Sequence, residues 1–273
     1  KLSVDKVNLS FLANASYVKN EIKNLGNQTG YIDKESLPTL GTVSRNQNGY
    51  PIGYFFGYKA IGVFQTQEEI DNYISPATGK PIQPNAVPGD TKFEDLNGDG
   101  VISDDNEDRT MIGKPNPDWM VGLTVAADWN GFDLSAFFQG SFGADVFDAL
   151  RRYELAAVNY TSDALERWTG PGTSNSMPRI VLGDTPKNFR PSTLLVHDAS
   201  FLRLRNLQVG YTLPAQLTRK AYIQRLRFYA SFDNLLTITG YKGMDPEIGS
   251  TMGIDKGVYP QARVYTFGLN LTF

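Results

Sequence analysis

The last ten residues of the chain alternate between apolar and polar side chains. Every second residue from Tyr265 to Phe273 is large and apolar, whereas the positions between them are mostly small or polar. A period of two predicts a β-strand, because successive strand side chains point to opposite faces. A soluble strand at a chain end seldom exposes such an aromatic surface. The pattern suits a strand with lipid on one side and water on the other.

The same alternation occurs on both sides of an Asn130-Gly131 pair. Residues 120–129 and 132–139 carry apolar side chains at every second position, so two strands with a two-residue connection are predicted. Asn-Gly is a preferred sequence for a type I′ turn, in which both central residues adopt positive φ. Trp129 and Phe132 flank the turn, where a membrane barrel carries an aromatic girdle.

Three further segments have a period of two, namely residues 7–17, 206–213 and 226–233. They are predicted to be strands on the same grounds. In residues 206–213 the odd-numbered positions carry the apolar side chains. If the same alternation continues towards the N-terminus, Arg203 and Arg205 fall on the apolar face. We therefore expect both arginines to lie beyond the membrane, on an extension of that strand.

Residues 52–64 complete a set of about seven predicted strands, which long segments separate. Residues 65–119 and 144–199 are rich in Pro, Gly, Asn and Asp and are expected to be loops. Short turns at one end and long loops at the other are typical of an all-β, transmembrane antiparallel β-barrel with long extracellular loops. The alternation leaves open a second fold, a soluble β-sandwich with large loops.

Composition narrows the functional classes. The 26 Lys plus Arg residues and 29 Asp plus Glu residues give a net charge of −3, so no basic surface for nucleic acid is expected. The chain has no cysteine, which excludes a disulfide scaffold and a thiolate metal site. No run approaches the roughly 18 apolar residues of a membrane helix. Because the chain starts at Lys1 without a signal peptide or initiator Met, we expect it to be part of a longer protein.

One local motif has the spacing of a calcium loop. The sequence from Asp95 to Ile102 follows the pattern D-x-N-x-D-G. The side-chain oxygens of Asp95, Asn97 and Asp99, with the carbonyl of Val101, could surround Ca²⁺ at about 2.3–2.6 Å. A solvated turn rich in Asp and Asn, without a metal, is the alternative.

The sequence does not fix which acid would complete the calcium shell. The twelfth loop position is Asn106, where an EF-hand has Glu. Asp104, Asp105, Glu107 and Asp108 lie nearby, and we favour Asp108 over Asp104. In either case we expect the ion to brace a loop and to take no part in catalysis.

No set of catalytic residues emerges, so we predict that the protein is not an enzyme. His197 is the only histidine, and no G-x-S-x-G sequence supplies a nucleophile for it to activate. We expect His197 to lie at the entry to a strand, and residues 163–168 to form a short helix in a loop. Tyr153, Tyr160 and Trp168 could either stack on sugar rings or pack the loop around them.

Several short sequences, taken in order, resemble the C-terminal barrel region of SusC/RagA-type TonB-dependent transporters of Bacteroidetes. Each sequence is short, but their order and combination are specific. They are Gly53-Tyr54-Phe55-Phe56-Gly57-Tyr58, Gly62-Val63-Phe64-Gln65, Gly89-Asp90, the Asp95 loop, Arg109-Thr110-Met111-Ile112-Gly113, Pro115-Asn116-Pro117-Asp118, Trp129-Asn130-Gly131-Phe132-Asp133-Leu134, Ser200-Phe201-Leu202-Arg203-Leu204-Arg205-Asn206, Gly210-Tyr211-Thr212-Leu213-Pro214, Asp233-Asn234-Leu235 and the strand that ends at Phe273.

The resemblance implies a barrel of about 22 strands with a plug in its lumen. Residues 1–273 would form its C-terminal part, with the plug domain and TonB box before Lys1 and the calcium-type loop at residues 89–113. The family's Asp before Arg-Thr corresponds to Asp108 here. The resemblance also implies a SusD-like surface lipoprotein as lid, and it leaves open a dimer of transporter–lipoprotein pairs.

Two functional hypotheses follow. The first is TonB-dependent import of a glycan or peptide across the bacterial outer membrane, without covalent chemistry. The second is a secreted, calcium-braced β-sandwich that binds or cleaves carbohydrate. They differ in what the apolar strand faces contact, which is lipid in a barrel and a second sheet in a sandwich.

Overall fold

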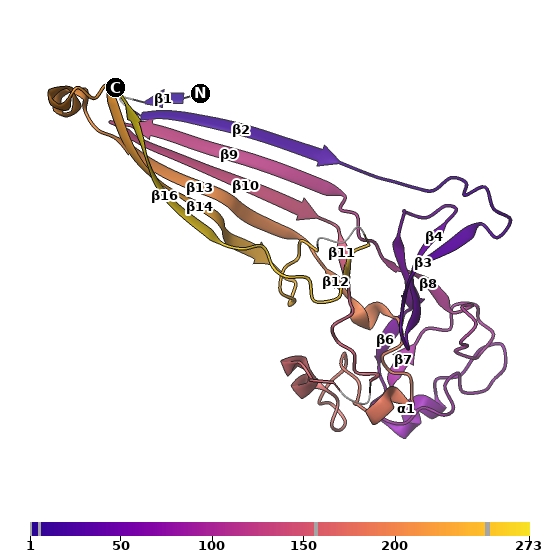
Figure 1. Ribbon diagram of the computed structural model, residues 1–273. Coiled ribbons are helices and arrows are strands. Elements are labelled where there is room, and N and C mark those ends of the chain that lie inside the picture. The colour runs from indigo at the N-terminus through magenta and orange to yellow at the C-terminus, as the bar shows by residue number, and fades with distance from the viewer. Residues whose placement is uncertain (1, 5–6, 156–157, 249–251) are drawn as a thin grey trace.

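The computed structural model describes residues 2–4, 7–155, 158–248 and 252–273, and an antiparallel sheet of seven strands dominates it (Figure 1). The strands in spatial order are β1 (Leu2–Val4), β2 (Val7–Tyr17), β9 (Trp119–Trp129), β10 (Phe132–Phe142), β13 (Phe201–Thr212), β14 (Arg225–Thr239) and β16 (Val264–Thr272). All the strands predicted from alternation are present except the one at residues 52–64. The sheet is curved and open, and both chain ends lie at the same end of it.

The connections at the other end of the large sheet fold into three small sheets. The first contains β3 (Tyr31–Leu37), β4 (Gly41–Gln47), β5 (Tyr54–Tyr58) and β8 (Arg109–Gly113). The second pairs β6 (Ala60–Val63) with β7 (Thr91–Phe93), and the third orders β12 (Val196–Asp198), β11 (Asp145–Asp148) and β15 (Ile254–Asp255). The prediction of one strand at residues 52–64 is therefore wrong, because the segment divides between two sheets.

Helices are few and short. The α-helices are α1 (Gln67–Asp71) and α2 (Ala215–Thr218). The 3₁₀ helices are η1 (Ser162–Glu166), η2 (Leu182–Asp184), η3 (Thr193–Leu195) and η4 (Arg219–Ala221), and η1 coincides with the helix predicted near residues 163–168. No helix among the described residues is long and apolar enough to cross a membrane.

The main hydrophobic core lies between the small sheets and not against the large one. Phe55 of β5 and Phe147 of β11 are fully buried, with ring centroids 5.9 Å apart. Leu37, Val43 and Ile254 complete the centre of this cluster. The small sheets therefore have a buried hydrophobic interior of their own.

Register aligns the apolar positions of six strands into continuous rows on one face of the large sheet. One row consists of Leu9, Ala127, Leu134, Val209, Ala230 and Phe267. Large side chains on this face are exposed, for example Phe11 at 56% and Phe267 at 75%. The face is thus not buried against a second sheet, as a β-sandwich would require.

Aromatic side chains stand at both ends of this apolar face. Neighbouring strands place Trp129, Phe132, Tyr211 and Phe228 side by side at the end with the Asn130-Gly131 turn, and Tyr17, Trp119 and Phe142 at the other. Trp119 and Trp129 are ten positions apart on β9, which is roughly 34 Å along a strand. With a strand tilt of about 40°, the two aromatic rows stand roughly 26 Å apart, close to the height of the apolar band in outer-membrane barrels.

A β-bulge at Arg205 corrects the expectation for the two arginines of β13. Phe137 of β10 pairs with Asn206 and Phe138 pairs with Leu204, so Arg205 is an extra residue. One extra residue reverses the alternation of the strand before it. Arg203 is therefore directed to the polar face, where it is 2% exposed, and both arginines lie within β13 rather than on an extension beyond the sheet.

The opposite face of the large sheet carries polar side chains that bond across strands. Arg227 of β14 donates from Nε to Oδ1 of Asp133 on β10 over 2.9 Å. The guanidinium passes over Gly210 of the intervening strand, where a Cβ would come within 2.5 Å of both partners. The missing side chain at Gly210 therefore lets this ion pair span three strands.

Candidate functional site

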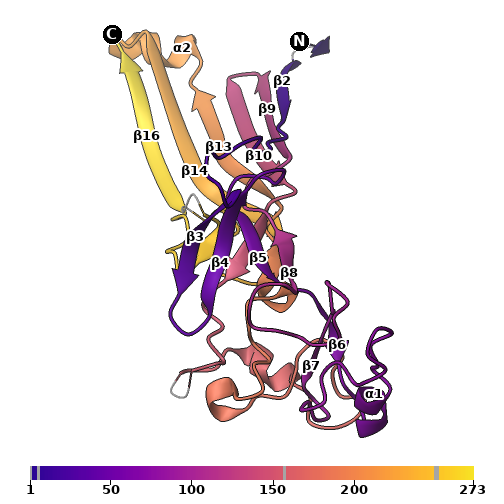
Figure 2. The ribbon, with the colours of Figure 1, turned by 90° about the vertical axis from the view of Figure 1, so that its right-hand side faces the viewer.

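We call the connections 18–118, 143–200 and 240–263 the loop assembly. They form a separate layer at the end of the large sheet that lies away from the chain termini (Figure 2). The assembly contains the predicted calcium-type loop and two clefts that this loop helps to line. It is therefore the candidate functional site.

The calcium-type loop is built from successive turns in which side-chain oxygens accept from the loop's own amides. Asp95 accepts at Oδ1 from the N–H of Gly98 (2.8 Å) and at Oδ2 from that of Gly100 (2.9 Å). Asn97 Oδ1 accepts from the N–H of Asp99 (3.0 Å). Gly98 and Gly100 have φ of 78° and 89°, so the tight path depends on glycine. This is the local folding that the D-x-N-x-D-G spacing predicts.

Asp108 closes the calcium-type loop and Asp104 does not. Asp108 is fully buried and accepts from the N–H of Leu96 (3.0 Å) and that of Ser103 (2.9 Å). Asp104 is directed outwards and forms an ion pair with Lys187. Asn106, at the twelfth position, has φ of 80° and accepts from Arg109 Nη1 (2.7 Å).

The oxygen donors of the loop suit a hard cation, since each carboxylate oxygen has a second lone pair beside the one its amide partner occupies. The predicted ligand Asp99 accepts at Oδ1 from the N–H of Val101 (2.9 Å). Within the described ranges, no three Asp, Glu or His side chains gather as the ligands of a metal centre. A cation would therefore draw on carbonyl and amide oxygens as well as on carboxylates.

Cations and aromatic rings alternate along one side of the loop assembly, and we call this row the cation–aromatic stack. Its members in order are Tyr31, Arg45, Phe56, Arg109, Tyr58, Arg190 and Phe93. The separation between guanidinium carbon and ring centre ranges from 3.7 Å for Arg45 over Phe56 to 5.7 Å for Arg109 over Tyr58. Such contacts stabilise each cation and fix the plane of its guanidinium.

Hydrogen bonds join the cation–aromatic stack to the calcium-type loop. The hydroxyl of Tyr58 donates to the carbonyl of Ser103 over 2.7 Å. Arg109 donates to the carbonyls of Phe56 (2.7 Å) and Thr42. The calcium-type loop is therefore held against β5 and β4 by two members of the stack.

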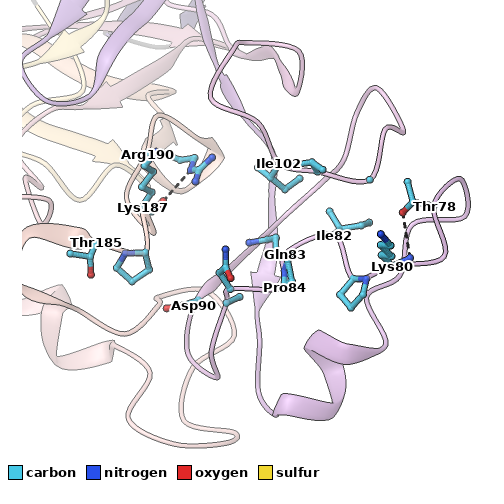
Figure 3. A pocket seen from close by; sticks show the side chains of 16 residues that line it. Thr78, Lys80, Ile82, Gln83, Pro84, Asp90, Ile102, Thr185, Lys187 and Arg190 are labelled. Atoms are coloured by element: carbon cyan, nitrogen blue, oxygen red, sulfur yellow. Dashed lines mark hydrogen bonds between the residues drawn. The ribbon is translucent and has the colours of Figure 1, made fainter.

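Two clefts lie on either side of the segment from Thr185 to Arg190. The first, of about 720 Å³, is bounded by residues 78–86, residues 100–102 and this segment (Figure 3). The second, of about 550 Å³, is bounded by residues 39–41, Asp104 and residues 183–191, among others. The calcium-type loop thus contributes a wall to each cleft.

Besides Asp104, the second cleft contains two acids of unlike environment, Asp184 and Glu154. Asp184 is 6% exposed and accepts from the N–H of Asn188 (2.9 Å) and that of Phe189 (2.8 Å). Burial, with Glu154 nearby, raises the pKa of Asp184 to about 6. Glu154 accepts at Oε1 from Arg152 and from Thr39 (3.1 Å).

Contacts with other protein side chains account for His197, Tyr153 and Trp168. His197 lies in β12, with Nε2 3.0 Å from Arg151 Nη1, and burial and this cation lower the pKa of His197. Tyr153 is 2% exposed and packs against Phe189 at 4.8 Å. Trp168 donates from Nε1 to Gln65 (3.2 Å). Tyr153 and Trp168 therefore pack the loops, the second of the two roles considered for them.

The sequence reasoning did not find the charged residues that line the clefts. Lys187 and Arg190 line both clefts, and Glu154 and Asp184 line the second. None of these residues belongs to a local motif, because the clefts form where segments more than eighty positions apart meet. The local signal was the aromatic sequence from Tyr54 to Tyr58, which supplies two of the four rings of the stack, Phe56 and Tyr58.

Relatives of the chain are named as receptors of one kind, although no protein-family model matches it. TonB-dependent receptor P3 of Formosa agariphila is 34% identical over 238 residues, which covers 83% of this chain and 23% of the relative. TonB-dependent receptor SusC of Bacteroides thetaiotaomicron is 30% identical over 263 residues, which covers 95% of this chain and 24% of the relative. The chain thus spans about a quarter of the length of these relatives.

Solved structures of similar proteins match the whole described fold. A structure of the RagAB peptide transporter superposes with a TM-score of 0.74 at 26% identity, covering 100% of this chain and 28% of the other. The RagAB peptide importer in an open-open state gives a TM-score of 0.72 at 27% identity, covering 99% and 27%. The fold and the sequence therefore lead to the same group of proteins.

Proposed function

The chain belongs to the SusC/RagA-type TonB-dependent receptors, and on this premise we propose that its protein imports an oligomeric nutrient across the bacterial outer membrane. The carrying observation is the exposed apolar face of the large sheet, with aromatic rows at both ends. Lipid contact stabilises such a face, whereas water would not. A secreted β-sandwich that acts on carbohydrate has no support from the exposed face or from the names of the relatives.

We place the loop assembly on the extracellular side. Outer-membrane barrels have short turns on the periplasmic side and long loops outside. The Asn130-Gly131 turn joins β9 and β10 with two residues, whereas residues 143–200 connect β10 to β13 through several elements of the loop assembly. On this orientation the two clefts face the medium from which a nutrient is captured.

The energy source and the partners follow from the family. We propose that TonB acts through a plug and TonB box elsewhere in the full protein, and that a SusD-like surface lipoprotein closes over the loop assembly. The RagAB proteins that resemble this chain are described as peptide importers. The imported oligomer is a glycan or a peptide, and the import step needs no covalent chemistry.

Growth on defined nutrients tests the import function. A strain without the full receptor should fail to grow on one oligomeric glycan or peptide and should still grow on its monomers. The wild-type gene should restore growth, and a gene without the TonB box should not. Growth of the deletion strain on every oligomer that the parent uses would contradict import by this protein.

We further propose that the calcium-type loop binds one structural Ca²⁺ through Asp95, Asn97, Asp99, Val101 and Asp108. Support comes from the alternating oxygen donors, the two positive-φ glycines and the buried closing acid. The ion would offset repulsion among the loop's carboxylates and stiffen a wall that both clefts share.

The calcium proposal can be tested on the purified full receptor. Asp95→Ala with Asp99→Ala should remove one bound Ca²⁺ per receptor, measured by elemental analysis, and should make residues 95–108 sensitive to protease. Glu68→Ala with Asp71→Ala removes two exposed acids of the neighbouring α1 helix and serves as the control. Equal calcium content in all three proteins would exclude this loop as the site.

A further inference from the structure

Arg190 lines both clefts and contacts two aromatic rings. Its guanidinium carbon is 4.7 Å from the centre of the Tyr58 ring and 4.9 Å from that of Phe93, and the two ring centres are 5.8 Å apart. Its Nε donates to the carbonyl of Lys187 over 3.2 Å. Contacts with two rings and one hydrogen bond restrict the motion of the guanidinium.

One nitrogen of this guanidinium lacks a hydrogen-bond partner. Arg190 Nη1 is buried and, within the described part of the chain, forms no hydrogen bond. The nearest carboxylate oxygen, Oδ1 of Asp104, stands 3.7 Å away, which is beyond hydrogen-bond distance. A buried donor without an acceptor is costly to a protein unless something else satisfies it.

Lys187 adds a second cation beside Arg190. Its ammonium pairs with Asp104, and the two side chains are 55% and 65% exposed. Exposed pairs of this kind contribute little free energy, so an incoming group can exchange with Asp104 at small cost. Lys187 and Arg190 both line both clefts, and Figure 3 places them on the wall opposite Ile102.

We propose that Lys187 and Arg190 form a subsite for a carboxylate group of the imported oligomer, and that Asp104 occupies this subsite when no ligand is bound. The proposal rests on the import function proposed above. A guanidinium edge next to an ammonium matches the two oxygens of a carboxylate. Asp104 is itself a carboxylate that lies against both cations, so the subsite already accommodates this group.

Glu154 and Asp184, the other acids of the second cleft, are bonded to other groups and do not neutralise Lys187 and Arg190. Glu154 is paired with Arg152 and bonded to Thr39, and the oxygens of Asp184 accept from two amides. Arg109 contributes a further cation to the same cleft. The ligand group could come from an acidic peptide or from a uronic-acid oligosaccharide, and both supply the same carboxylate.

Direct binding to the full receptor in detergent tests the subsite. The probes are tetraglutamate and tetragalacturonate, each compared with a neutral counterpart, tetraglutamine or maltotetraose. At least one acidic probe should bind to the wild-type receptor, and Arg190→Gln should weaken its binding roughly tenfold or more. Asp104→Asn should tighten binding of the same probe, because it removes the competing carboxylate.

Two further variants keep the test decisive if Arg190→Gln does not assemble. Lys187→Gln changes an exposed side chain and should weaken the same probe, whereas Lys220→Gln removes an equal charge at the opposite end of the strands and should not. Binding of tetraglutamate alone assigns the carboxylate to a peptide, and binding of tetragalacturonate alone assigns it to a glycan. The subsite proposal would be overturned if neither acidic probe bound tightly, if the neutral counterparts bound with equal affinity, or if Asp104→Asn bound the acidic probe more weakly. Growth on a neutral oligomer in any of these cases would leave the proposed import function intact.

Discussion

Arg203 of β13 donates from Nη2 to Oδ1 of Asp245 over 2.5 Å, and this ion pair joins the large sheet to the connection that follows β14. The two side chains are only 2% and 7% exposed. Glu247 accepts from both Arg203 and Arg205 and extends the contact to the bulge. The bulge at Arg205 therefore directs two arginines to the polar face, where they anchor residues 240–248 of the loop assembly.

Removal of one member of this buried pair should loosen the anchored loop. Arg203→Met leaves Asp245 buried and unpaired, which costs about 3–5 kcal/mol when nothing replaces the partner. Hydrogen exchange of residues 240–248 in the full receptor should rise strongly. Arg203→Met with Asp245→Asn should recover part of the protection. Unchanged exchange in the single variant would show that the pair does not hold the loop.

The two faces of β13 should differ sharply in their tolerance of charge. Val209 lies on the apolar face, between Leu134 and Ala230 in register, and its neighbour Gln208 lies on the polar face between Ser135 and Ser231. An Arg on the lipid face near mid-membrane costs about 2–4 kcal/mol. Val209→Arg should therefore reduce the folded receptor in the outer membrane far more than Gln208→Arg, as heat-modifiable mobility on gels can measure. The reverse order would show that the faces are assigned wrongly.

The turn between β9 and β10 should not tolerate a side chain at Gly131. Asn130 and Gly131 have φ of 47° and 90°, as a type I′ turn requires. A Cβ at Gly131 would lie 2.8 Å from the carbonyl oxygen of Thr212. Gly131→Ala should cost about 1–3 kcal/mol through strain and this contact. Asn130→Gly keeps the turn and is the control, and equal urea resistance of the two variants would contradict the assignment.

Acid should stabilise the segment around Asp184. Its pKa is about 6 in the folded protein and 3.8 without the fold, so ionisation is disfavoured by folding. The stabilisation is complete below pH 3.8 and is lost as the pH rises through about 6. The shift corresponds to about 3 kcal/mol at most.

Hydrogen exchange of residues 184–190, corrected for intrinsic rates, can measure this effect. Protection should be greater at pH 4.5 than at pH 7. The turn at residues 169–173 contains no acid and provides the internal control. Protection that rises with pH would mean that Asp184 is stabilised as the anion by Arg190 and the two amides instead.

The sequence alone determined six of the seven strands of the large sheet, all except β1, and the faces of most of them. The alternation has the same period as the strand pleat, and the apolar side chains need only lipid as a partner. The local sequence pattern is therefore enough to predict these strands and their faces. The Asn-Gly turn fixed one register for the same local reason. The turn geometry of the calcium-type loop was equally visible, since most of its bonds join residues at most five positions apart. The exceptions join Leu96 to Asp108 and Asn97 to Glu107.

Tertiary structure alone decided the bulge, the small sheets and the clefts. Arg203 changes face because one extra residue at Arg205 shifts the pleat, and a period of two has no signal for such an insertion. Residues 52–64 were predicted as one strand but divide between two sheets, because β5 pairs with β8 whereas β6 pairs with β7. Arg190 contacts the rings of Tyr58 and Phe93 from a different part of the chain. Such sites depend on which distant segments pack together, and that choice is made by the whole set of contacts and not by any one stretch of sequence.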